Sequence, residues 1–185
     1  MTKRQPKGTP VGGQFAQERK PDGGDLVPPR KGSVVNTAPW GQDELVKTKV
    51  FFAKRVAEMN RREPDYAYRW YSLDQKLVGY GGVAAVPPVE PEMDLDVLLE
   101  SGRLFISSPV VEKGDPNQCH ANIAQLWTNE EIDAIYTGYA LSDDGLWRQH
   151  SWGFRGESLI ETTDPRVAYF GFEVPDSDQW STSQL

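Results

Sequence analysis

Residues 133–163, DAIYTGYAL-SDDG-LWRQHSWGF-RG-ESLIETT, decide the fold of this chain. Their aromatic and β-branched runs predict three strands, Asp133–Leu141, Leu146–Phe154 and Glu157–Thr163. The segments between them, Ser142–Gly145 and Arg155–Gly156, have the composition of tight turns. The stretch therefore predicts an antiparallel meander.

The register of the last two strands follows from the turn between them. If Arg155–Gly156 forms a two-residue turn, Phe154 pairs with Glu157, and counting outward places His150 directly opposite Glu161. Directly opposed residues share a face, with Cβ atoms about 5 Å apart. We therefore expect the His150 imidazole and the Glu161 carboxylate to form a hydrogen bond.

A helix carrying the single cysteine precedes this meander. In residues 115–127, DPNQCHANIAQLW, Asp115 fits an N-cap, Pro116 the first helical position, and Gln118 completes a capping box. Cys119 then lies in the first turn, where unpaired N–H groups and the helix dipole favour the thiolate. The alternative is that Cys119 is a small buried hydrophobic residue.

The neighbours of Cys119 have more ordinary interpretations. We expect His120, about 100° further around the helix, to be a surface or capping residue. Asn122 lies one turn below Cys119 and either lines the site or forms local hydrogen bonds. A single cysteine excludes a thiolate-rich zinc site, and we expect no metal or cofactor. The alternative is a metal site whose ligands are Cys119, His120, His150 and Glu161.

This order of a helix-borne cysteine, a strand-borne histidine and an acid on the next strand, with the triplet His150-Ser151-Trp152, resembles the papain-like superfamily in its compact bacterial forms. The NlpC-like peptidases and transglutaminase-like hydrolases are such forms, and the resemblance spans residues 110–172. It implies that Cys119 is the nucleophile, His150 the base and Glu161 the orienting residue. The backbone N–H of Cys119 is one candidate oxyanion donor, and candidate side chains for the oxyanion hole or the site lining are Asn117, Asn122 and Trp152.

The remaining sequence adds helices and one more strand. Helical spacing of apolar residues predicts a helix over Asp43–Arg62, and a shorter one over Glu92–Glu100. Gly102 fits the C′ position of the second helix, and Arg103–Val111 has the composition of a strand. The aromatic-rich residues 65–90 show no clean period, so their structure stays open.

Composition divides the chain into three parts. Residues 1–40 contain 12 Gly and Pro, so we expect a disordered basic leader over 1–39. A single α+β domain over 40–175 and a flexible tail over 176–185 complete the prediction. Charge changes at a different point, with 13 Lys/Arg against 6 Asp/Glu in residues 1–62, and 7 against 21 in residues 63–185.

Two features of the sequence bear on partners and location. The segment KGTPVGGQFA at residues 7–16 resembles the leaders of actinobacterial and actinobacteriophage proteins, and its basic character suits contact with nucleic acid or a larger assembly. No apolar run reaches the roughly 20 residues of a membrane span, and no signal-peptide pattern is present. We expect a cytoplasmic protein, in a bacterial cell or a phage-infected host, without a membrane partner.

Two functions fit these observations. The first is a cysteine hydrolase or acyltransferase that acts on an amide, isopeptide or thioester bond of a protein or peptide. The second is a non-catalytic phage or mobile-element protein that binds a host factor or assembly. They differ in the reactivity of Cys119, because a catalytic thiol is alkylated near neutral pH and a packed one only on unfolding.

Overall fold

A computed structural model describes residues 40–175, so the predicted leader and tail lie outside the described residues. Within this range, four helices and seven strands form an α+β fold, which confirms the predicted class. The helices are α1 (Gln42–Arg62), α2 (Tyr66–Tyr80), α3 (Leu95–Ser101) and α4 (Cys119–Thr128). The strands are β1 (Ala84–Ala85), β2 (Arg103–Phe105), β3 (Val110–Val111), β4 (Ala134–Leu141), β5 (Leu146–Arg155), β6 (Ser158–Glu161) and β7 (Ala168–Glu173).

All the strands belong to one sheet in the order β2-β7-β4-β5-β6-β3, and β1 pairs with the start of β5. Antiparallel pairing of β4 with β5 and of β5 with β6 confirms the meander. The sheet as a whole is mixed, because β1 and β3 run parallel to β5 and β6. This mixed character was not part of the sequence-based prediction.

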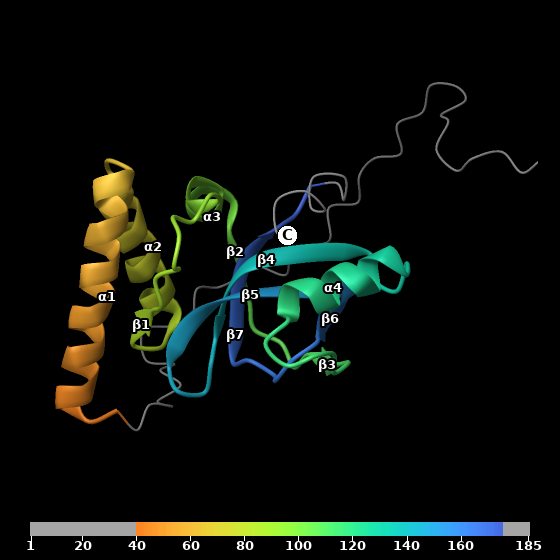
Figure 1. The fold of residues 1–185 in the computed structure, drawn as a ribbon. Helices are drawn as coiled ribbons and strands as arrows, with labels where there is room; N and C mark the ends of the chain where they lie inside the picture. Colours follow the sequence, from red (N-terminus) through yellow and green to blue (C-terminus); the bar gives the residue numbers. More distant parts are fainter. Residues whose placement is uncertain (1–39, 176–185) are drawn as a thin grey trace, which may run out of the picture.

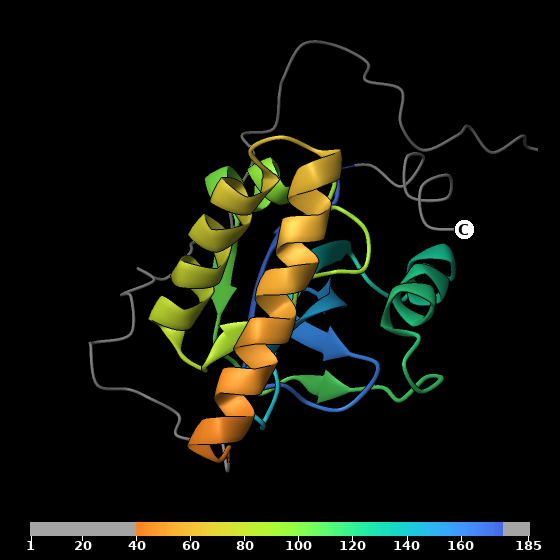
Figure 2. The same cartoon turned by 60° about the vertical axis from the view of Figure 1, so that its left-hand side comes forward.

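The helices cover one face of the sheet in two places. Figures 1 and 2 show α1 and α2 side by side at one end of the sheet, with α4 separate from them toward the other end. The α1–α3 core includes Trp70, which packs against Tyr139 of β4. The α4 core brings Ile123 against Ile135 and Ile160. This arrangement leaves the start of α4 close to the middle of β5.

The opposite face of the sheet carries a second aromatic core. By the two-residue period of a strand, His150 lies on this face together with Trp152, whereas Trp147 lies on the helix-covered face. Trp152 packs there with Tyr136 and Tyr169.

The predicted strand over Arg103–Val111 is wrong, because the segment forms two short strands at opposite edges of the sheet. β2 pairs with β7 at one edge and β3 pairs with β6 at the other. Phe105, at the end of β2, contacts the rings of Tyr136 and Trp152 on the aromatic face. After Phe105 the chain leaves the first edge and reaches β3 at the other.

Gly102 follows α3 directly as its C-cap, but its φ of −60° is not the left-handed conformation expected at C′. A Cβ at this position would lie 2.4 Å from the Leu98 carbonyl oxygen and 2.5 Å from the Phe170 ring. Close packing, rather than backbone conformation, therefore requires glycine here.

The predicted register between β5 and β6 is also wrong, by two residues. Phe154 pairs with Leu159 rather than with Glu157, and Arg155 pairs with Ser158. The turn is therefore formed by Gly156 and Glu157, with Gly156 at φ 57°. A shift of two keeps every side chain on its predicted face, because the period of a strand is two.

Contacts from outside the hairpin account for this shift. The Arg155 guanidinium donates to the Glu131 carbonyl at 2.6 Å and to the Glu112 carboxylate at 2.7 Å. The Gly156 N–H donates to the Asp133 carboxylate at 2.6 Å. These contacts hold Arg155 in the strand and move the turn onward. Continuing the observed register places Glu161 opposite Trp152, so it is diagonal to His150 and on the same face.

Candidate active site

Cys119 is the first residue of α4, as the first-turn prediction required, but the predicted capping box does not form. Gln118 is the N-cap, and no side chain caps the helix. The reason is that Asn117 adopts a left-handed conformation, with φ 60°, which delays the start of the helix. Asn122 instead clamps the preceding loop, because its amide donates to the Asp115 carbonyl at 2.9 Å and accepts from the Asp115 N–H at 3.1 Å. Asn122 thus has the local role and does not line the cavity described below.

His150 and Glu161 form a buried pair. His150 is 3% exposed and Glu161 0%, and the distance from His150 Nε2 to Glu161 Oε2 is 2.8 Å. Glu161 also accepts hydrogen bonds from the Tyr169 hydroxyl at 2.9 Å and from the N–H and hydroxyl of Thr163 at 2.7 and 2.9 Å. Burial alone would raise the pKa of Glu161, but His150 and Thr163 outweigh it and lower this pKa. The carboxylate is therefore ionised and fixes the imidazole.

Cys119 interacts with the same imidazole. Because Nε2 of His150 is bonded to Glu161, Nδ1 is the ring nitrogen left for the Cys119 thiol. Burial opposes the charged form of both groups, but their mutual hydrogen bond and charge outweigh it, which lowers the pKa of Cys119 and raises that of His150 to about 9. The N–H groups of Ser151 and His120 also lower the pKa of Cys119. Both shifts favour the thiolate and the imidazolium over the neutral thiol and imidazole.

The surface role predicted for His120 is wrong, because its side chain packs onto the sheet. Its Nδ1 lies 2.7 Å from the Ser151 hydroxyl, which donates to Thr137 at 3.2 Å. Burial, and then the charge of His150, lower the pKa of His120 and keep it neutral. His120 and Ser151 are the residues that directly follow Cys119 and His150. Their contact therefore holds the start of α4 against β5 beside the reactive pair.

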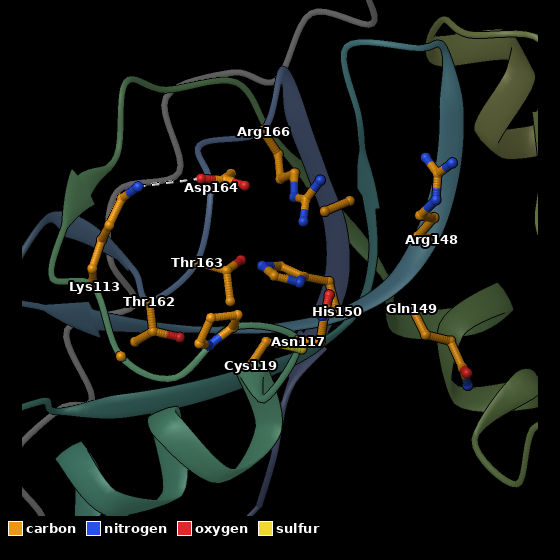
Figure 3. A pocket seen from close by; sticks show the side chains of 13 residues that line it. Lys113, Asn117, Cys119, Arg148, Gln149, His150, Thr162, Thr163, Asp164 and Arg166 are labelled. Carbon is orange, nitrogen blue, oxygen red and sulfur yellow. Dashed lines mark hydrogen bonds and ion pairs between the residues drawn. The ribbon is translucent and has the colours of Figure 1, made fainter.

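A cavity of about 340 Å³ opens onto Cys119 and His150. Figure 3 shows its walls, formed by the loop before α4, by β5 and by residues 162–166. Asn117 lines it, so that prediction agrees with the structure. Trp152 does not line it, since this residue is 0% exposed and stacks against His150 with ring centroids 6.5 Å apart. Trp152 therefore supports the imidazole from behind.

Two partners of Glu161 were missed by the sequence analysis. Thr163 lies two residues after Glu161, a spacing typical of local side-chain to backbone bonds, so this signal was available. Tyr169 was not detectable locally, because it lies on β7 and reaches His150 across β4. Ala140, its direct neighbour on β4, is small enough to leave that path open.

Thr162 is the other unexpected feature of the cavity. Its side chain is 1% exposed, lines the cavity, and its hydroxyl has no hydrogen-bond partner within the part of the chain that the structure describes. A buried polar group without a partner destabilises a fold by about 1–3 kcal/mol.

We predict that Thr162→Val, which keeps the shape, leaves the free energy of unfolding unchanged or raises it by about 1 kcal/mol. Urea denaturation tests this, with Thr163→Val as the contrasting variant, since the Thr163 hydroxyl is bonded. A clear loss in Thr162→Val would contradict the prediction.

Over residues 40–175, no group of three or more His, Cys, Asp or Glu side chains could hold a metal ion. The alternative of a metal site at Cys119, His120, His150 and Glu161 therefore has no geometric basis. In the same range, no helix combines the length and apolar character needed to cross a membrane.

Comparisons with protein-family models, with curated proteins and with solved structures found no match to this chain.

Proposed function

We propose that the protein is a papain-like cysteine hydrolase or acyltransferase that acts on an amide, isopeptide or thioester bond. One observation carries the proposal. Cys119 interacts with His150, His150 is hydrogen-bonded to Glu161, and Cys119 and His150 both line the cavity. A nucleophile, a base and an orienting acid in contact are what acyl transfer through a covalent intermediate requires. A buried cysteine with only a packing role would need neither partner.

The proposed reaction proceeds in two steps. The Cys119 thiolate attacks the carbonyl carbon, and the C–N or C–S bond breaks as His150 gives its proton to the leaving group. A thioester on Cys119 remains. Water then loses a proton to His150 and attacks the thioester, which releases the acid and restores the thiolate and imidazolium. An amine in place of water would give the transferase outcome.

Stabilisation of the oxyanion falls to groups at the start of α4. The helix N-terminus offers N–H groups without helical partners, among them that of Cys119. The Asn117 side chain, held in the left-handed turn, lines the same cavity. These are the two donors we assign to the developing oxyanion.

The direct test uses p-nitrophenyl acetate, a simple activated ester. We expect a burst of p-nitrophenolate and an acetyl group on Cys119, detected by intact mass and peptide mapping. Cys119→Ser is the matched control and should show neither. If the folded protein gives no burst, and Cys119 is modified only after denaturation, the non-catalytic interaction protein is the better interpretation.

Glu161→Gln tests the orienting role. We expect it to slow acylation by about 10-fold or more, yet by less than the loss of Cys119 or His150, because Glu161 orients the imidazole and does not react. Burst kinetics measure this, and Glu157→Gln, the same change in the exposed turn, is the control. An effect of Glu161→Gln no larger than that of the control would remove Glu161 from the mechanism.

The wider biological setting remains part of the proposal. The protein or peptide substrate, a cytoplasmic location, and an origin in actinobacteria or their phages follow from the sequence arguments above. Contact of the basic leader with nucleic acid or an assembly belongs with them, as does the alternative of a host-binding phage protein.

A further inference from the structure

Three cationic side chains line the cavity beside Cys119, and they differ in whether a carboxylate lies within ion-pair distance. Lys113 lies 3.4 Å from Asp164, and Arg148 donates to both carboxylate oxygens of Asp144 at 2.7 and 2.5 Å. Arg166 has no carboxylate within ion-pair distance among residues 40–175, and its guanidinium donates to the Ser142 hydroxyl at 3.0 Å. Arg166 thus has no direct ion pair among these residues, although its charge helps to lower the pKa of Asp144, which is bonded to Arg148.

Arg166 is placed where a substrate would meet it. Figure 3 shows its side chain directed toward His150, while Arg148 points away from the imidazole. Its backbone N–H bonds to the Tyr169 hydroxyl at 3.2 Å, the same hydroxyl that donates to Glu161. The position of Arg166 is thus tied to the His150–Glu161 pair.

A second, independent observation indicates the chemistry of the ligand. The unpartnered hydroxyl of Thr162 is buried at the same cavity. A guanidinium has donors only, and an unpartnered buried hydroxyl can donate as well. Both can therefore donate to a group that only accepts hydrogen bonds, and the guanidinium also favours a negative charge on that group. A carboxylate meets both requirements and matches the planar fork of arginine.

We propose that the substrate carries a carboxylate close to the bond that Cys119 attacks, and that Arg166 binds this carboxylate. The inference rests on the proposed function and narrows its substrate class to acidic or carboxylate-terminated peptides. It also explains how a part of the chain with 7 Lys/Arg against 21 Asp/Glu (residues 63–185) accepts an anionic substrate.

The test compares two alkylating reagents that differ in charge, iodoacetate and iodoacetamide. Each protein's iodoacetamide rate is its own reference, which removes differences in thiol reactivity. We expect Arg166→Gln to lower the ratio of the iodoacetate rate to the iodoacetamide rate by about 5-fold, the effect of one opposite charge a few ångströms away. The difference from wild type should shrink as salt is added.

Two further variants complete the design. Arg103→Gln, at an exposed position on β2, removes the same charge elsewhere and should keep the wild-type ratio. Arg166→Lys keeps the charge and should give a ratio close to that of the wild type. Circular dichroism checks that every variant is folded. An unchanged ratio in Arg166→Gln, with Cys119 still labelled by iodoacetamide, overturns this inference alone. If neither reagent labels folded wild-type protein, the proposed function and this inference both fail.

Discussion

Replacing His150 with alanine should slow the alkylation of Cys119 by iodoacetamide at about pH 6 by roughly 100-fold. In the native site, the imidazolium lowers the pKa of the thiol against the opposing effect of burial. Without it, the pKa should return to about 8.5 or higher, which leaves well under 1% thiolate at that pH. The measurement is the alkylation rate as a function of pH, followed by intact mass.

The fold should survive this substitution. Glu161 would keep its hydrogen bonds from Tyr169 and Thr163. His120→Asn is the matched control, because it removes the other imidazole, which is neutral and bonded to Ser151. This control should shift the alkylation profile far less. If His150→Ala leaves the profile unchanged, His150 and Cys119 do not communicate, and the interaction-protein interpretation becomes the better one.

The elements at the site were predictable because their signals are local. Aromatic and β-branched runs identified β4 and β5, and the turn residues between them include Asp144, which accepts the Leu146 N–H at 3.1 Å. Placing Cys119 in the first turn of a helix was also correct, although for another reason than the capping box. Faces depend only on the two-residue period, so His150 and Glu161 were put together despite the wrong register.

The errors arise where distant contacts decide the structure. The turn after β5 is set by Glu131 and Asp133, which precede β4 and are not visible in the hairpin sequence. In α2, aromatic residues occupy both faces, since Tyr66 is buried while Tyr68 is 78% exposed. The helical period is therefore hidden, although Leu73 and Leu77 of the same helix are fully buried. Tyr169 reaches the site from another strand, so no local pattern could show it.

The Cys119–His150 pair should also determine how the stability of the domain depends on pH. In the unfolded chain the imidazole and the thiol titrate near about 6.5 and 8.5. Folding lowers the pKa of Cys119 and raises that of His150 to about 9. Where the folded thiol has its pKa below that of the free imidazole, each state of the pair holds one proton between the two unfolded values, on sulfur when unfolded and on the imidazole when folded. The pair then adds no pH dependence to the free energy of unfolding.

Outside this window the stabilisation that the pair gives the fold declines on both sides. Below about pH 6.5, the unfolded chain binds a second proton, on the imidazole. The folded thiolate binds its proton only at its own, lower pKa, so the free energy of unfolding falls as pH falls. Above about pH 8.5, the unfolded chain has lost both protons while folded His150 keeps one, so stability falls as pH rises through about 9.

Cys119→Ser removes the thiol proton, since serine does not titrate. It also lowers the pKa of His150, which Cys119 helps to raise, although the bond of His150 to Glu161 stays. In this variant, the contribution of His150 is fully present below about pH 6.5 and is lost as pH rises through its folded pKa. The free energy of unfolding of the wild type, minus that of Cys119→Ser, should therefore rise by up to about 1.4 kcal/mol per pH unit. The rise begins at the folded pKa of Cys119 and ends at the folded pKa of His150 in the variant or at about pH 8.5, whichever is lower. Urea denaturation at several pH values measures this difference, in which the titration of His120 largely cancels. A difference that stays flat with pH would mean that the native thiol keeps its proton, and the thiolate–imidazolium pair would have to be abandoned.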